Sequence, residues 1–116
     1  QIATGHDCRL TSPEFETALA EGLSSANVKV IRLGLVTTPI SYYSTFALEN
    51  ISGAIQITGS HNPPEYNGLK ILVGKDSLFG ENIQKLKEII NAKDFVSGTG
   101  SAEEKEIISS FSITTL

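Results

Sequence analysis

The sequence has one cysteine, no long apolar run and few positive charges, and each scarcity excludes a class of protein. With Cys8 alone, the 116-residue chain cannot form an internal disulfide, which favours a cytoplasmic location. Its apolar stretches are far too short to span a bilayer. A net charge of −4 and a pI near 5.1 provide no basic surface for nucleic acid or an anionic membrane. We expect Cys8 to be a small buried side chain rather than a nucleophile.

The remaining composition is that of one ordinary globular domain. Hydrophobic residues make up 40% of the chain and charged residues 19%, and neither repeats nor low-complexity tracts occur. The chain begins at Gln1 without a methionine, and its first residues already have a strand-like pattern. We therefore interpret the chain as a fragment of a longer protein that lacks its first strand.

Apolar segments alternate with turn-forming segments along the chain. We expect strands at Ile2–Thr4, Val28–Val36, Gly53–Thr58 and Leu69–Val73. We expect helices to begin at Thr11–Pro13, at Thr37–Pro39 and at Gly80, and to end near Ser25–Asn27, Asn50 and Ala92. This order predicts an α/β fold: a three-layer α/β/α domain with a mixed, mostly parallel sheet and one antiparallel strand.

The helix starts and helix faces have specific signals. Thr11 or Ser12 is expected to cap the first helix, with Glu14 completing a capping box and Gly5–Thr11 forming a polar loop before it. The expected buried faces are Phe15, Ala18, Leu19 and Leu23; then Ile40, Tyr43, Phe46 and Ala47; then Ile83, Leu86 and Ile90, with Phe79 just before them.

The character of the sequence changes after residue 96. Ser97–Ser101 has the composition of a linker, and Glu103–Glu106 is charged. We therefore assign residues 1–96 to the domain and residues 97–116 to an exit segment that leads toward a further domain.

One short connection determines how two strands pair. About ten residues separate Gly53–Thr58 from Leu69–Val73, and they include Pro63 and Pro64. A parallel crossover needs about a dozen residues or more, usually helical, and two prolines disfavour a helix. The two strands should therefore run antiparallel, with Ser60 and Lys70 at the same edge of the sheet, where open α/β sheets bind ligands.

The connecting loop contains groups that suit phosphate chemistry. Ser60 follows a strand in a glycine-containing loop, where backbone N–H groups can face an anion. A phosphate on its hydroxyl would add about −1.5 to −2 charges, which His61 and Lys70 could offset. Taken residue by residue, a surface turn explains the same composition, so only the whole string distinguishes the two interpretations.

That string, residues 58–70 (TGSHNPPEYNGLK), resembles the phosphoserine loop of the α-D-phosphohexomutase superfamily, in the form typical of bacterial phosphomannomutase/phosphoglucomutase. Three further segments are similar to other parts of the family's first domain, in the same order: Gly5–Ser12, Gly34–Pro39 and Ser97–Ser101. The resemblance therefore covers nearly the whole chain.

The resemblance implies roles for four residues of this string and for Arg9. Ser60 would be the phosphoserine that exchanges its phosphoryl group with a hexose phosphate, through a bisphosphorylated sugar, between positions 1 and 6. Its phosphate would also provide one ligand to Mg²⁺. His61 and Lys70 would assist proton transfer and stabilise charge, and Asn62 and Arg9 would contribute to substrate binding. From the residues alone, Arg9 is equally suited to an ion pair with Asp7 or Glu14.

The resemblance also implies that essential parts lie outside this chain. The family enzyme has four domains, and most Mg²⁺ ligands would lie in the absent ones. We therefore expect the isolated chain to be inactive as a mutase, and its exposed sheet edge to permit self-association.

Three alternatives remain open at this stage. The chain could be a non-catalytic anion-binding or interaction module, or belong to a phosphoglucosamine mutase. A serine hydrolase built on Ser60, His61 and Asp7 is a third possibility, although the loop lacks a Gly-x-Ser-x-Gly elbow.

Overall fold

The computed structural model describes residues 1–59, 62–63 and 65–107. The strands are β1 (Ile2–His6), β2 (Lys29–Leu35), β3 (Gly53–Ile57), β4 (Leu69–Val73), β5 (Asp76–Ser77) and β6 (Ser101–Glu104). The helices are α1 (Ser12–Ser25), α2 (Thr38–Ala47) and α3 (Glu81–Ala92). Within these residues, no helix is both long enough and apolar enough to cross a bilayer.

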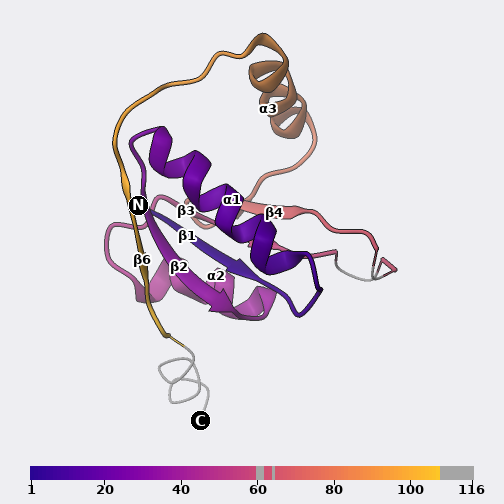
Figure 1. Ribbon diagram of the computed structural model, residues 1–116, viewed down its shortest axis with the longest axis vertical. Helices are drawn as coiled ribbons and strands as arrows, with labels where there is room; N and C mark the ends of the chain where they lie inside the picture. The colour runs from indigo at the N-terminus through magenta and orange to yellow at the C-terminus, as the bar shows by residue number, and fades with distance from the viewer. Residues whose placement is uncertain (60–61, 64, 108–116) are drawn as a thin grey trace.

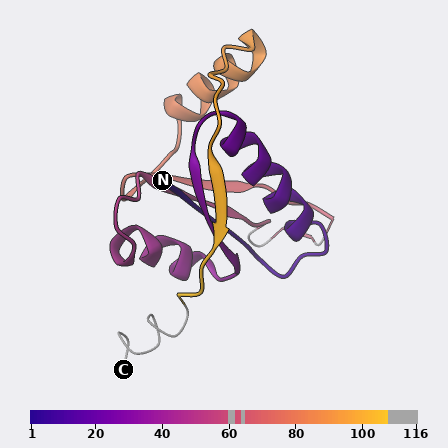
Figure 2. The same cartoon turned by 60° about the vertical axis from the view of Figure 1, so that its left-hand side comes forward.

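The strands form one mixed sheet in the order β5-β4-β3-β1-β2-β6. β1 is parallel to β2 and β3, and β2 is parallel to β6. β4 is antiparallel to both of its neighbours, β3 and β5. α1 covers one face of the sheet and α2 the other, which gives three layers (Figures 1 and 2). The fold class expected from the sequence is therefore confirmed.

The short connection between β3 and β4 has the predicted consequence. The two strands are antiparallel, with Ile57 opposite Leu69 and Gln56 opposite Lys70. The N–H of Thr58 donates to the carbonyl of Gly68 at 2.9 Å and closes the loop at its base. The loop thus starts at the carboxyl end of a central parallel strand, and Lys70 follows directly on the neighbouring strand.

The apolar core lies between the sheet and α2. Its buried members are Ala3, Ile31, Leu33, Val36, Ile40, Ala54 and Ile107. Ile40 was expected on the buried face of α2, but Phe46 is exposed, and the other fully buried residues of the helix are Ser41, Ser44 and Thr45. Because these side chains are small, α2 can lie close to the sheet. Their hydroxyl groups can be buried because Ser44 and Thr45 donate hydrogen bonds back to carbonyls of their own helix.

The opposite face of the sheet is different, and here the predicted helix face was wrong. The fully buried residues of α1 are Ser12, Glu16 and Ala20, whereas Phe15 and Ala18 are exposed. Thr11 makes no capping hydrogen bond, since its hydroxyl oxygen instead accepts one from Asn67. Polar contacts to β1, described below, have overridden the apolar periodicity of the helix.

The residues around β1 also differ from expectation. β1 extends to His6, so Gly5 and His6 belong to the strand and not to the loop. An added Cβ at Gly5 would lie 2.5 Å from Val36, so the absent side chain allows the strand to continue under α2. Cys8 is exposed and not buried, because it lies in the turn beyond the end of β1.

The segment expected to be a linker contains a strand. β6 pairs in parallel with β2, with Lys29 opposite Ser101 and Arg32 opposite Glu104. A Cβ at Gly100 would lie 2.1 Å from the carbonyl oxygen of Val28, so glycine here permits close approach of two backbones rather than flexibility.

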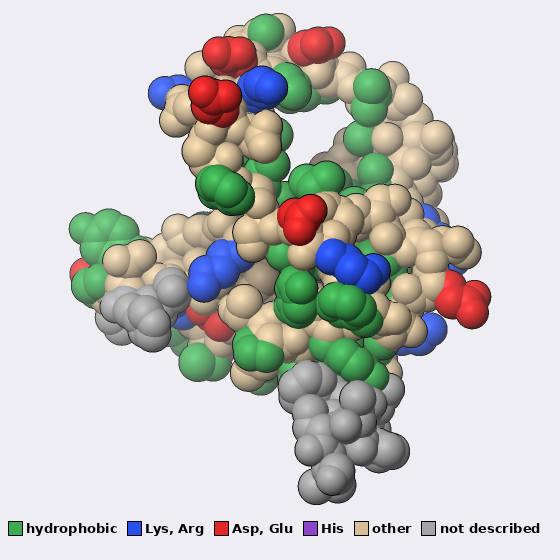
Figure 3. Space-filling model, turned by 180° about the vertical axis from the view of Figure 1, so that it is seen from behind, with side chains coloured by type: hydrophobic (Ala, Val, Ile, Leu, Met, Phe, Trp, Pro, Cys, Tyr) green, Lys and Arg blue, Asp and Glu red, His purple; other side chains and the backbone are tan. Residues whose placement is uncertain are grey.

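α3 has the predicted bounds to within one residue, but the buried stripe expected for it was wrong. No residue of α3 is buried: Ile83 is 39% exposed and Ile90 54%, and Phe79 before it is 75% exposed. α3 stands away from the sheet (Figure 1), and the space-filling view shows hydrophobic side chains on its surface (Figure 3). Its stability therefore depends on local hydrogen bonds, with little packing to support them.

This exposure predicts unequal protection of the helices in the 116-residue chain. Backbone amides of α3 should exchange hydrogen about two orders of magnitude faster than those of α1, because α3 can unfold without opening the core. Hydrogen exchange measured by NMR compares the two helices within one sample. Equal protection of α3 and α1 would contradict this description.

Candidate active site

The candidate site lies where β1 and β3 end and the 58–68 connection begins. The N–H of Asp7 donates to the carbonyl of Ile57 at 3.0 Å, and the N–H of Val36 donates to the carbonyl of His6 at 3.0 Å. These bonds continue the pairing of β1 with both neighbours beyond its last residue. The residues that follow β1 are therefore held beside the start of the loop.

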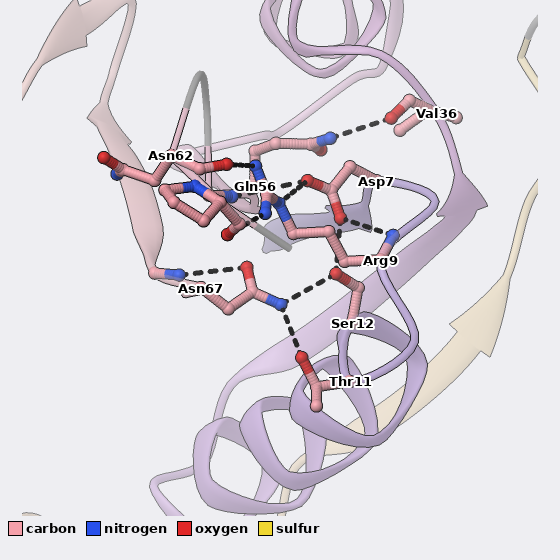
Figure 4. Close-up of polar contacts among 11 residues, drawn as sticks. Asp7, Arg9, Thr11, Ser12, Val36, Gln56, Asn62 and Asn67 are labelled. Carbon is pink, nitrogen blue, oxygen red and sulfur yellow. Dashed lines mark hydrogen bonds and ion pairs between the residues drawn. The ribbon is translucent and has the colours of Figure 1, made fainter. Parts of the chain in front are cut away.

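The Asp7 carboxylate is the central acceptor of the site (Figure 4). Oδ1 accepts hydrogen bonds from the Ser12 hydroxyl and from the Arg9 amide, the latter at 3.1 Å. Oδ2 accepts from Arg9 Nε at 3.2 Å and from the Gly59 amide at 3.3 Å. One carboxylate thus connects the turn after β1, the first turn of α1 and the loop after β3.

These donors determine the charge state of Asp7. Burial alone would raise the pKa of the carboxyl group, but hydrogen bonds from Ser12, Arg9, Thr58 and Gly59 outweigh it and lower the pKa from 3.8 to about 2. Asp7 is therefore ionised at neutral pH, and its charge is neutralised by Arg9. It acts here as an anchor for donors.

Arg9 holds the loop from its other side. Nη1 donates to the carbonyl of Pro63 at 2.7 Å and Nη2 to the carbonyl of Asn62 at 2.9 Å, while Nε pairs with Asp7. The planar guanidinium can make all three bonds at once because its donors lie in a fixed fork. Of the two roles that the sequence left open for Arg9, the ion pair with Asp7 is present, and it places the guanidinium against the loop.

Gly59 is required where it stands. A Cβ added to it would lie 2.4 Å from the Arg9 guanidinium carbon and 2.7 Å from the carbonyl of Tyr66. The loop backbone can approach Arg9 this closely only because Gly59 has no side chain. The glycine before Ser60, noted in the sequence as part of the motif, thus has a steric explanation.

Asn67 is a residue of the site that the sequence analysis did not identify. Its Nδ2 donates to Thr11 Oγ1 at 3.0 Å and to Ser12 Oγ at 2.9 Å, and its Oδ1 accepts from the Gly68 amide at 2.9 Å. Asn67 therefore ties the end of the loop to the start of α1. Its only sequence signal is the Asn67-Gly68 dipeptide, which is typical of any turn.

The predicted site residues have different positions in the structure. Arg9 and Asn62 are brought together, though Asn62 contributes its carbonyl oxygen. Lys70 is exposed on β4 and lines a cavity of about 540 Å³ together with Gln56 and residues at the start of α2, among them Thr38 and Pro39. Ser60 and His61 lie outside the described residues, so their predicted pairing with Lys70 stays a prediction.

The described residues do not form a metal site of their own. Among them, no three His, Cys, Asp or Glu side chains lie close enough to hold an ion together. The predicted ligand, the phosphate on Ser60, belongs to a residue outside that set. The residues described therefore do not fit a Mg²⁺ site by themselves.

Comparison with known proteins identifies the family. The family model described as phosphoglucomutase/phosphomannomutase, alpha/beta/alpha domain I, matches residues 1–97. The chain belongs to this family. The phosphohexomutase resemblance seen in the loop, and the assignment to the first domain, are thereby confirmed.

Individual relatives of this phosphohexomutase domain agree with the match. Phosphomannomutase/phosphoglucomutase of Pseudomonas aeruginosa is 45% identical over 107 residues, which are 92% of this chain and 23% of the relative. Phosphoglucomutase of Neisseria gonorrhoeae is 43% identical, with 92% and 24% covered. The crystal structure of a phosphoglucomutase/phosphomannomutase family protein from Burkholderia thailandensis has a TM-score of 0.88 at 34% identity and covers 96% of this chain and 26% of its own. The chain thus spans about a quarter of these relatives.

The hydrogen bonds to Asp7 predict a specific dependence of stability on pH. Because the pKa of Asp7 is depressed in the folded state, the ionised group stabilises the fold above pH 3.8, and this contribution is lost as the pH falls from 3.8 toward 2. Asp7→Asn should therefore lower the free energy of unfolding at pH 7 by about 1–2 kcal/mol, and the difference should shrink to near zero at pH 2.

Urea unfolding at pH 7, 4 and 2.5 measures this difference. Asp94→Asn is the matched control, since Asp94 is exposed and its side chain forms no hydrogen bond or ion pair with another described residue. A deficit for Asp7→Asn that stays constant across the pH range would contradict the role assigned to the ionised carboxylate.

Proposed function

We propose that this chain is the phosphoserine-bearing part of a phosphomannomutase/phosphoglucomutase that moves a phosphoryl group between positions 1 and 6 of a hexose phosphate. Ser60 carries the group. It gives it to the free hydroxyl of the substrate, and the bisphosphorylated sugar returns its other phosphate to Ser60. The relatives named phosphomannomutase/phosphoglucomutase and phosphoglucomutase support this reaction.

The observation that carries the proposal is the pair of contacts that Asp7 and Arg9 make with Gly59 and Asn62, which flank Ser60 and His61 in the sequence. The residue before the pair, Gly59, donates its amide to Asp7, and the residue after it, Asn62, gives its carbonyl to Arg9. The N–H of Asn62 also donates to the carbonyl of Gly59 at 3.0 Å. A loop fixed on both sides of its nucleophile suits phosphoryl transfer, where catalysis consists mainly of positioning and electrostatic stabilisation.

The charges around the loop fit the same reaction. The transferred group is dianionic and its transition state spreads charge over the phosphoryl oxygens, so nearby cations stabilise it. Lys70 follows the loop directly on β4, and its ammonium group makes no hydrogen bond with another described residue. We assign to Lys70 and His61 the stabilisation of this charge and proton transfer at the sugar hydroxyl.

The serine hydrolase alternative is less well supported. It needs Asp7 to orient a histidine, but the Asp7 carboxylate already accepts hydrogen bonds from Ser12, Arg9 and Gly59. A carboxylate neutralised by an arginine is also a poor partner for an imidazolium ion.

Substitution in the full-length protein tests the assignment. Ser60→Ala should lower the conversion of glucose 1-phosphate to glucose 6-phosphate by about three orders of magnitude or more, because the proposed transfer proceeds through this hydroxyl. Lys70→Ala should lower kcat by about a hundredfold. A coupled assay of glucose 6-phosphate measures both, with Lys85→Ala on α3 as the control lysine. Near-normal turnover by Ser60→Ala would refute the proposal.

The 116-residue chain alone should show no mutase turnover. It spans about a quarter of its relatives, and the described residues form no metal site, so the remaining substrate and Mg²⁺ contacts are expected from other parts of the enzyme. The same coupled assay, run with this polypeptide and Mg²⁺, checks the expectation. Formation of glucose 6-phosphate at a rate above that of the Ser60→Ala chain would contradict it.

A further inference from the structure

The interface between α1 and the sheet contains a buried carboxylate that the proposed reaction does not use. Glu16 is 0% exposed, although carboxylates are almost never fully buried without partners. Its Oε1 accepts a hydrogen bond from Thr4 Oγ1 at 3.0 Å, and its Oε2 is hydrogen-bonded to His6 Nδ1. Arg32 Nε lies 3.9 Å from Oε1 and adds positive charge. Both carboxylate oxygens of Glu16 are therefore fixed by residues of β1.

Thr4 and His6 hold Glu16 from one face of one strand. They are two positions apart on β1, so their side chains point to the same side of the sheet, toward α1. Thr4 is itself fully buried in the middle of the sheet. We refer to Thr4, His6 and Glu16 as the β1–α1 latch.

The latch is one helical turn away from the candidate site. Ser12 and Glu16 are four residues apart on α1 and therefore lie one above the other on the same face. Ser12 donates to Asp7, which directly follows His6 in the chain, and accepts from Asn67 of the loop. Two successive turns of α1 are thus bonded to two successive parts of β1 and its extension.

This arrangement restricts how α1 can move. Sliding or rotating the helix as a unit would break the bonds of Glu16 to β1 together with those of Ser12 to Asp7 and Asn67. Apolar contacts are non-directional and would not impose the same restriction. A well-packed apolar pair at these positions would hold the helix on the sheet but would not define its axial position.

We propose that the β1–α1 latch positions Ser12, and through it Asp7 and Asn67, so that the loop carrying Ser60 keeps its reactive geometry. His6 and Glu16 are then positioning residues for phosphoryl transfer and do not contact the substrate. This inference rests on the proposed function. It predicts that removing the latch lowers kcat and leaves KM unchanged, because the loop is misplaced while substrate contacts elsewhere remain.

The test uses the full-length protein with both partners replaced, His6→Leu together with Glu16→Leu. Removing both avoids leaving one buried charge unpaired, while the buried Thr4 hydroxyl loses its acceptor and lowers the stability modestly. We expect the melting temperature to fall by a few degrees, kcat to fall about tenfold and KM to stay within about twofold. Glu21→Leu, the same change at an exposed position of α1, should leave kcat unchanged.

His6→Asn provides the rescue. Its amide N–H can reach the place of Nδ1 and donate to Glu16, so this variant should keep most of the parental kcat. Should the double variant not fold, Thr4→Val decides instead: valine suits a buried strand and removes the hydroxyl donor, and kcat should fall about threefold.

Each outcome has a distinct meaning. A double variant that folds and keeps the parental kcat would overturn the inference and leave the latch a purely structural cluster. If the double variant does not fold, a folded Thr4→Val variant with the parental kcat would overturn it in the same way. A loss of kcat that His6→Asn shares in full would overturn it too, since the hydrogen bond to Glu16 would then be irrelevant. A parent without mutase turnover would instead refute the proposed function.

Discussion

The arrangement of the candidate site depends on one partly buried ionic contact, the pair of Asp7 with Arg9. Asp7 receives donors from the first turn of α1 and from the amide before Ser60, and Arg9 donates to the carbonyls beyond His61. Two residues that follow one strand thereby organise a loop more than fifty positions later in the sequence. The described residues of the loop form no helix or strand, so this contact largely determines where they lie.

The two faces of the sheet are stabilised in different ways. α2 packs on an apolar core, where close packing and burial provide most of the stability. α1 instead presents Ser12 and Glu16 to β1 and is fixed by directional bonds. Because hydrogen bonds are directional, the polar layer defines the axial position of α1 more narrowly than apolar contacts alone would. The helix with the specified position is the one next to the candidate site.

Much of the architecture could be predicted from the sequence because it depends on local patterns. β2 and β4 follow from apolar runs, and the antiparallel pairing of β4 follows from the length and the prolines of one loop. The predicted face of α1 failed because Glu16 looks like a solvent-facing residue until Thr4 and His6 are brought beneath it. β6 was missed because its residues are polar and its partner, β2, lies about seventy positions earlier.

The candidate site divides in the same way. The loop string was recognisable as a motif, and the ion pair of Arg9 with Asp7 was one of the roles that the sequence left open. Asn67 was not identified, because an asparagine before a glycine is common in turns and only the fold places it beside Thr11 and Ser12. Contacts between distant segments are what a single sequence does not encode in any local pattern.

The direction of β6 has a consequence for how a larger enzyme could be built around this domain. Because β6 is parallel to β2, it ends at the same edge of the sheet as β1 and β3. Two strands separate it from β3, a distance of about 15 Å at the usual strand spacing. Polypeptide continuing from β6 therefore leaves the sheet at the edge where the 58–68 connection also begins. Sequence that follows this domain would need only a short path to reach that edge.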